Sequence, residues 1–173
     1  MPTPNSEITK IVLGVLSERL EPLGFKRRGA SFVRDRIETL HIVALQKSDA
    51  SNSGYVRATA NLGVYSKSLA AKLGEPPQTA SEAACHWRAR IGHLTPEKYD
   101  KWWSIADTMQ AATAGQEMVV AILEFGIPEL NRVGTDFGLI EEWRAGRGGG
   151  LPKALSKRYL SLLSNSPSPR PLD

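Results

Sequence analysis

The fold is decided by residues 55–66, which read Tyr-Val-Arg-Ala-Thr-Ala-Asn-Leu-Gly-Val-Tyr-Ser. One alternating set is small or apolar and comprises Val56, Ala58, Ala60, Leu62 and Val64. The set between is mostly polar or aromatic and comprises Tyr55, Arg57, Thr59, Asn61 and Tyr65. A period of two is the pattern of a β-strand, because successive side chains point to opposite faces of a sheet. The stretch predicts a long strand with one core face and one polar and aromatic face.

The strands before it are expected to form an antiparallel meander. Between residues 25 and 66 the period stays at two, and turn signals fall at Gly29, at Asp35 and in the Ser/Asn-rich run 48–54. The stretch 38–47 has apolar residues on both faces, which is typical of a central strand covered on both sides. The sequence therefore predicts that a further element covers the second face of this strand.

Helical spacing appears at both ends of the chain. Residues 5–20 repeat apolar side chains at the spacing of one helical face, and Pro22 and Gly24 then end the helix. Three further helices are expected over 116–132, 135–145 and 152–163, the first bent or split at Pro128. We therefore expect an α+β fold, with an antiparallel sheet of about five strands packed against an N-terminal helix and three or four C-terminal helices. Residues 1–163 are expected to be a single domain, and 164–173 a flexible Pro/Ser-rich tail.

Three connecting segments carry weaker signals. Residues 67–78 begin like a short helix and break at Gly74, Pro76 and Pro77, as a mobile loop would. The run 85–91 alternates like a strand, with His86, Arg88 and Arg90 on one side and Cys85, Trp87, Ala89 and Ile91 on the other. Thr95-Pro96-Glu97 is a helix-start signal and predicts a short helix leading to Trp102 and Trp103.

Composition limits the kinds of protein this chain can be. It has 41% hydrophobic and 23% charged residues, as folded globular chains do. No apolar run approaches the ~20 residues of a membrane span, no secretory signal is visible, and one cysteine cannot form an internal disulfide. We expect a cytoplasmic protein without a membrane partner. His41, His86 and His93 lack metal-ligand spacing, so no metal or other cofactor is expected.

The net charge of +4 is compatible with an acidic partner. Lys26, Arg27, Arg28, Arg34 and Arg36 form the densest basic cluster. Charged edge strands resist aggregation, and this explanation is preferred to a nucleic-acid patch.

The candidate binding surface combines two strands. His86, Arg88 and Arg90 would form a row about 6 to 7 Å apart along one strand face. Placed beside Arg57, Asn61 and Tyr65, this row could receive a carboxylate, a phosphate or an acidic protein segment. Structural pairing of the arginines with acids from the helices is an alternative that stays open. The remaining partner-binding candidates are Gln46 and Lys47, where the central strand ends, and Trp103.

Three functions remain possible. The leading one is a non-enzymatic binding domain, because no nucleophile is paired with a base; Cys85 and His86 are adjacent and would point to opposite faces. The first alternative is a small hydrolase-like enzyme that uses His86 with Arg88 and Arg90 on an anionic substrate. The second is a weak nucleic-acid-binding domain.

Five short motifs together resemble a known bacterial family. They are Leu23-Gly24-Phe25-Lys26 with Phe32 and Arg34, Gln46-Lys47-Ser48, Asn61-Leu62-Gly63-Val64-Tyr65, Cys85-His86 with Arg88 and Arg90, and Trp102-Trp103. In order and spacing they are similar to the family catalogued as domain of unknown function 4304, over roughly the first two thirds of the chain. The resemblance implies a similar α+β domain and transfers no catalytic residue. Some similar small bacterial domains resemble immunity proteins that neutralise toxins, so such a role is one fold-level expectation.

Overall fold

The computed structural model describes residues 4–51, 54–76 and 81–165. Its six strands form one sheet: β1 (Lys26–Arg28), β2 (Ser31–Asp35), β3 (Thr39–Lys47), β4 (Val56–Ser66), β5 (Trp87–Arg90) and β6 (Trp103–Ile105). The α-helices are α1 (Pro4–Leu20), α2 (Lys67–Leu73), α3 (Ile91–Leu94), α4 (Thr108–Ala121), α5 (Ile127–Val133), α6 (Asp136–Arg144) and α7 (Lys153–Ser164). The expected α+β fold is confirmed.

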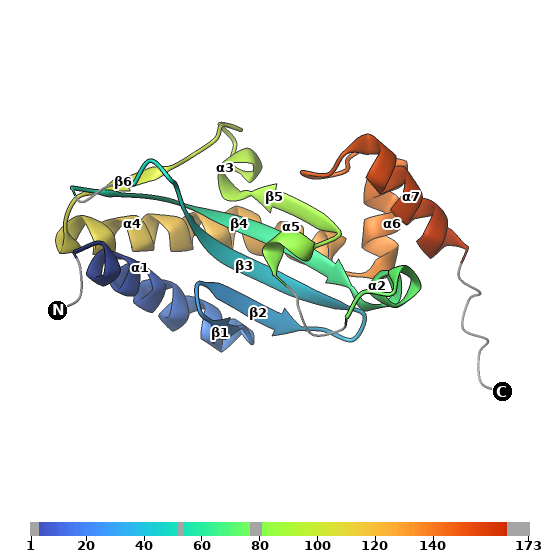
Figure 1. Ribbon diagram of the computed structural model, residues 1–173, viewed down its shortest axis with the longest axis horizontal. Coiled ribbons are helices and arrows are strands. Elements are labelled where there is room, and N and C mark those ends of the chain that lie inside the picture. Colours follow the sequence, from blue (N-terminus) through green and yellow to red (C-terminus); the bar gives the residue numbers. More distant parts are fainter. Residues whose placement is uncertain (1–3, 52–53, 77–80, 166–173) are drawn as a thin grey trace.

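The sheet is antiparallel throughout and is organised around β4. Its order is β1-β2-β3-β4-β5, and β6 also pairs with β4 (Figure 1). Along one edge β4 pairs with the whole of β3, so that Thr39 lies opposite Ser66 and Lys47 opposite Ala58. On the other edge it pairs first with β6 and then with β5. The expected meander is therefore present, and β5 and β6 share one side of its longest strand.

The main core lies between one sheet face and the long helices. The predicted apolar set of β4 is buried there, together with α1 residues such as Leu16 and α4 residues such as Met118. Figure 1 shows α4 running behind the sheet, with α1 beside it. The two helices pack closely because Gly115 of α4 lies against the side chain of Val15. This layer buries most of the apolar surface that drives folding.

A second, smaller apolar cluster covers the other face, which we call the outer face. It comprises Val33, Ile42, Tyr65, Ala70 and Cys85. Ala70 belongs to α2, and Cys85 follows a short 3-10 helix at Glu82–Ala84. These segments bury the second side of β3, which confirms that a further element covers it.

The prediction of a helix beginning at Thr95-Pro96-Glu97 is wrong. The Thr95 hydroxyl donates to the Gly92 carbonyl at 3.0 Å, so it closes the turn of the preceding helix α3 rather than capping a new one. Residues 95–102 have no helix, and Lys98 has a positive φ of 49°. Trp103 and Ile105 then alternate inward on β6. The bulky apolar side chains at this spacing favour a strand on the core.

The helix predicted over 116–132 begins earlier and is divided. Asp107 caps α4 by accepting a hydrogen bond from the Gln110 amide, so the helix starts at Thr108. A π-helical segment, Ile122–Gly126, then precedes α5, whose first turn contains Pro128. The split expected at Pro128 is present, because proline is accommodated where a new helix begins.

The remaining helical predictions agree closely with α1, α2, α6 and α7. Gly74 ends α2 in the left-handed conformation, as predicted. Of the expected tail, residues 166–173 lie outside the described residues, as do 77–80 of the predicted loop. None of the helices in the described part of the chain is long and apolar enough to span a membrane.

The close approach of Cys85 to the sheet gives a stability prediction. A Cβ at Gly63 would lie 2.5 Å from Cys85 Sγ and 2.8 Å from Cys85 Cβ. Gly63→Ala should therefore lower the free energy of unfolding by about 1–3 kcal/mol, the usual cost of overpacking. The double variant Gly63→Ala/Cys85→Ala should recover part of this loss in equilibrium urea unfolding.

The control is Gly14→Ala in α1, where a Cβ meets nothing within 4 Å. It should raise the free energy of unfolding, by up to about 1 kcal/mol, because alanine favours a helix over glycine. A Gly63→Ala protein as stable as the unchanged chain would contradict the packing described for Cys85.

Candidate functional site

Five of the predicted site residues meet in one open hollow of about 740 Å³ on the outer face. We call it the polar hollow. Its floor comes from the ends of β3, β4 and β5, which are hydrogen-bonded neighbours. Glu82 and His93 also line it. The predicted residues that it unites are Gln46, Lys47, Asn61, Arg88 and Arg90.

Arg90 is held by neutral and acidic partners within this hollow. Its Nε donates to Asn61 Oδ1 at 3.3 Å and its Nη2 to Gln46 Oε1 at 3.2 Å. Its Nη1 makes an ion pair with Asp100 at 2.6 Å. These hydrogen bonds fix the plane of the guanidinium, so Arg90 is a rigid part of the wall. For this residue the structural pairing left open by the sequence is present.

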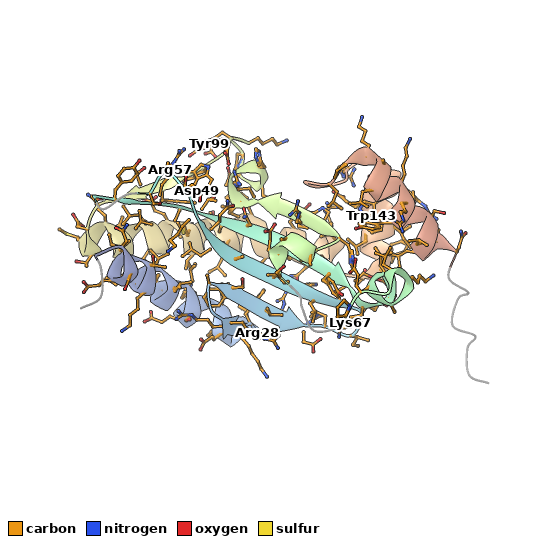
Figure 2. The ribbon with its side chains drawn as sticks, viewed as in Figure 1. Arg28, Asp49, Arg57, Lys67, Tyr99 and Trp143 are labelled. Atoms are coloured by element: carbon orange, nitrogen blue, oxygen red, sulfur yellow. The ribbon has the colours of Figure 1, made fainter. Side chains whose placement is uncertain are left out.

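Trp102 connects Arg90 to Arg57. The guanidinium carbons of Arg90 and Arg57 lie 4.8 and 5.2 Å from the centre of the Trp102 ring. The indole Nε1 donates to Asp100 Oδ2 at 3.0 Å. Arg57 lies at the end of β4 away from Lys67, as Figure 2 shows. It is thus joined to the hollow through the tryptophan and does not line it.

Arg88 is less well paired than Arg90. Its Nε lies 4.0 Å from Glu82 Oε1, the limit of an ion pair, and this buried Nε has no hydrogen-bond partner in the described structure. About a third of the Arg88 side chain is exposed. Burial raises the pKa of Glu82, and the charges of Arg88 and Arg90 oppose that rise. Arg88 therefore retains hydrogen-bonding capacity, and Lys47, exposed beside it, has no partner among the described residues.

His86 is fully buried and does not line the hollow. The Ser66 backbone N–H donates to its Nδ1 at 3.0 Å, so the ring proton is on Nε2, which donates to Glu75 Oε2 at 3.1 Å. Tyr65 stacks on the ring at 4.8 Å and Tyr159 packs at its edge. Burial lowers the pKa of His86, and the Glu75 carboxylate opposes this. With both nitrogens occupied, the histidine joins β4, α2 and α7, and it has no free lone pair for proton transfer.

Tyr65 and Cys85 are also buried, at 3% exposure each. The expected alternation fails at Cys85, because this residue lies on the outer face while Trp87 belongs to the main core. The hydroxyl of Tyr65 donates to the Pro76 carbonyl at 3.3 Å. Burial raises the pKa of the Cys85 thiol, which keeps it protonated and unreactive. Both side chains are therefore part of the outer-face packing rather than of an exposed surface.

Trp103, one of the partner-binding candidates, lies in the core and not at a binding surface. It is 6% exposed and belongs to the main core, and its Nε1 donates to Glu117 Oε2 at 2.8 Å. The alternation of β6 turns Trp103 inward, and Trp102 just before the strand is half-buried. Of the tryptophan pair, Trp102 is the one a partner could reach.

The basic cluster is divided between two places. Lys26 and Arg28 line a second outer-face hollow, of about 760 Å³, between β1 and α2. Arg34 and Arg36 line a third hollow beside the turn between β2 and β3. Within the described ranges, no three histidine, cysteine, aspartate or glutamate side chains are grouped as metal ligands.

The sequence missed the acids and the aromatic ring that hold Arg90 and His86. Asp100 and Trp102 come from an irregular segment after α3, and Glu75 follows α2, so neither strand nor helix periodicity points to them. The one sequence signal for these partners was the charge of the arginines, because a half-buried arginine requires hydrogen-bond acceptors close by. Arginines at alternate strand positions therefore predicted partners without saying which ones.

Comparison with family models gives one match. The model described as Domain of unknown function (DUF4304) matches residues 16–132. It spans from α1 to α5 and contains the whole sheet, whereas α6 and α7 lie beyond it. This confirms the resemblance and its extent. No curated protein and no solved structure matches the chain.

The second buried histidine gives a pH prediction. His41 accepts from Arg34 Nη2 at 2.9 Å and donates to the Gly134 carbonyl at 3.1 Å. Burial, together with Arg34 and Arg36, lowers its pKa from 6.5 to about 4. Between these values the unfolded chain binds a proton that the folded chain does not. The free energy of unfolding should therefore fall by about 3 kcal/mol as the pH drops from 7 to 4.

Urea unfolding at pH 7, 5.5 and 4.5 measures this effect as a difference from His41→Gln. The amide of glutamine can form similar hydrogen bonds without titrating, so the variant should lose that part of the pH dependence. His93→Gln, an exposed control, should behave like the unchanged chain. Identical pH profiles for His41→Gln and the unchanged chain would contradict the assignment.

Proposed function

Because the chain belongs to the family described as Domain of unknown function (DUF4304), a description that assigns no chemistry, we propose its function from its own geometry. We infer that it is a non-enzymatic binding domain, and that its polar hollow receives carboxylates of an acidic protein segment. A toxin-neutralising role of the immunity type would be one case of such an interaction.

The proposal rests on Arg88, whose guanidinium still has N–H groups available to donate hydrogen bonds. Its side chain is two-thirds buried, Glu82 lies 4.0 Å from its Nε, and this Nε has no acceptor among the described residues. Burying a charged donor without a good partner is costly, so the site gains from an incoming anion. A carboxylate fits the planar guanidinium and can accept two hydrogen bonds from it.

The surroundings of Arg88 support the same assignment. Lys47 adds a second cation without a partner in the described residues, and Arg90 adds a third that Asp100 neutralises. The lining thus contains three cations and one acid, Glu82, whose pKa is raised by burial. Arg90 acts as a positioning residue, because its hydrogen bonds to Gln46 and Asn61 hold the floor rigid.

The two alternatives have less support. A hydrolase-like enzyme would need a free nitrogen on His86 and access to it, but the ring is buried with both nitrogens bonded. A nucleic-acid surface would need cations along one continuous track, but the basic cluster is divided between two hollows.

Charge reversal in the polar hollow tests the proposal. The probe is fluorescein-labelled hexaglutamate, whose anisotropy is followed at low salt. The unchanged chain should bind it, and Lys47→Glu/Arg88→Glu should weaken binding at least tenfold, because two attractive charges become repulsive. Thermal unfolding should remain within a few degrees, since neither side chain has a strong internal partner.

The matched control is Lys10→Glu/Arg19→Glu on α1, which makes the same change in net charge on exposed residues away from the outer face. It should retain most of the affinity. If both double variants lose affinity equally, binding reflects net charge alone and the hollow is not the site. A labelled DNA 12-mer that binds more tightly than hexaglutamate, with steep salt dependence, would favour the nucleic-acid alternative instead.

A further inference from the structure

A second site of different chemistry lies at the opposite end of β3 from the polar hollow. The hollow there, which we call the turn hollow, has a volume of about 690 Å³. It lies between the β2–β3 turn and the junction of α5 with α6. The residues that matter are Arg34, Arg36, Ile37, Glu38, His41 and Asn131.

Arg34 is held in this hollow by neutral groups. Its Nη2 donates to His41 Nδ1 at 2.9 Å and to Asn131 Oδ1 at 2.7 Å. His41 is itself fixed by its hydrogen bond to the Gly134 carbonyl. The guanidinium carbon lies 4.8 Å from the centre of the Phe25 ring. The guanidinium is therefore pre-oriented, with the N–H groups of Nη1 left without acceptors in the described residues.

Two acids, Asp35 and Glu38, line the turn hollow, but neither forms an ion pair with its arginines. Among the described residues no acid lies within ion-pair distance of Arg34 or Arg36. The nearby acids are engaged elsewhere, since Asp35 pairs with Lys67 at 2.6 Å and Glu38 accepts from the Asp136 amide at 2.9 Å. The Nε of Arg34 is buried without a partner, and burial and Arg36 both lower the pKa of Arg34. A half-buried guanidinium beside a like charge is a costly arrangement that an anion would relieve.

Two exposed apolar side chains lie in or close in sequence to the lining of the turn hollow. Ile37 lines it and is 96% exposed. Phe137, two residues beyond the lining residue Thr135, is 71% exposed. The Glu38–Asp136 hydrogen bond joins the two segments that carry these side chains. An anion that reaches Arg34 from solvent would thus bring any attached apolar group next to exposed apolar surface.

We propose that the turn hollow binds a carboxylate carried by an apolar body, with Arg34 and Arg36 taking the carboxylate and Ile37 the apolar part. The site shares no residue with the polar hollow, so it does not depend on the function proposed above. It adds a ligand class, the amphipathic monocarboxylate, to the acidic segment proposed for the outer face.

The test is an NMR titration of the full chain with phenylacetate, following the Arg34 Nε–Hε signal and the Ile37 methyl signals. Both should shift and saturate. Arg36→Gln should weaken binding at least fivefold while leaving thermal unfolding unchanged, because Arg36 is exposed and its guanidinium has no partner in the described structure. Arg34→Gln should weaken it at least tenfold, and its fold is checked by the same thermal measurement. Ile37→Asn should lower the affinity for phenylacetate to that for acetate.

Two comparisons make the test decisive. Arg88→Gln, in the polar hollow, should bind phenylacetate as the unchanged chain does, whatever its effect on hexaglutamate. Shifts that stay linear with concentration in the unchanged chain, or that saturate at the same phenylacetate concentration in Arg36→Gln, would overturn the proposal. Tighter binding of inorganic phosphate than of phenylacetate would overturn the carboxylate assignment and indicate a phosphate site.

Discussion

The strict alternation of β4 is the constraint on which the rest of the structure depends. One set of its side chains is buried in the main core, and the other set forms the middle of the outer face. Because β4 pairs with β3, β5 and β6, a shift by one residue would exchange these faces along the centre of the sheet. The polar hollow exists because Asn61 is held on the outer side, opposite Ala44 and Arg90.

The arginines of the sheet differ in whether their N–H groups already have acceptors. Arg90 has satisfied hydrogen bonds to Asn61, Gln46 and Asp100, and a satisfied arginine stiffens its surroundings. Arg88 and Arg34 are partly buried with an unpaired Nε each. Arg88 and Arg90 are thus similarly buried but differ in the hydrogen bonds they can still donate. This difference is found only by assigning an acceptor to each N–H group.

The strands and the site residues could be predicted from the sequence to different extents. The period-two pattern was sufficient for β2, β3, β4 and most of β5, because burial of one face dictates it. The prediction for residues 95–105 failed because Thr95-Pro96 is typical of a helix start. In the structure the inward packing of Trp103 and Ile105 favours a strand instead. His86 and Tyr65 were expected at the surface. Alternation predicts which face of the sheet a side chain is on, but not whether another element packs over that face. Here α2 and α7 supply that cover, by contacts distant in sequence.

The glycine-rich loop before α7 packs along the outer edge of β5. Gly150 donates its amide to the Arg88 carbonyl at 2.7 Å, and a Cβ at Gly149 would lie 2.5 Å from the same oxygen. This glycine-rich loop, beyond the family match, therefore blocks the free side of β5. The opposite border, β1, is only three residues long and entirely cationic. β1 and β5 are thus poorly suited to pair with a strand of another copy of this protein.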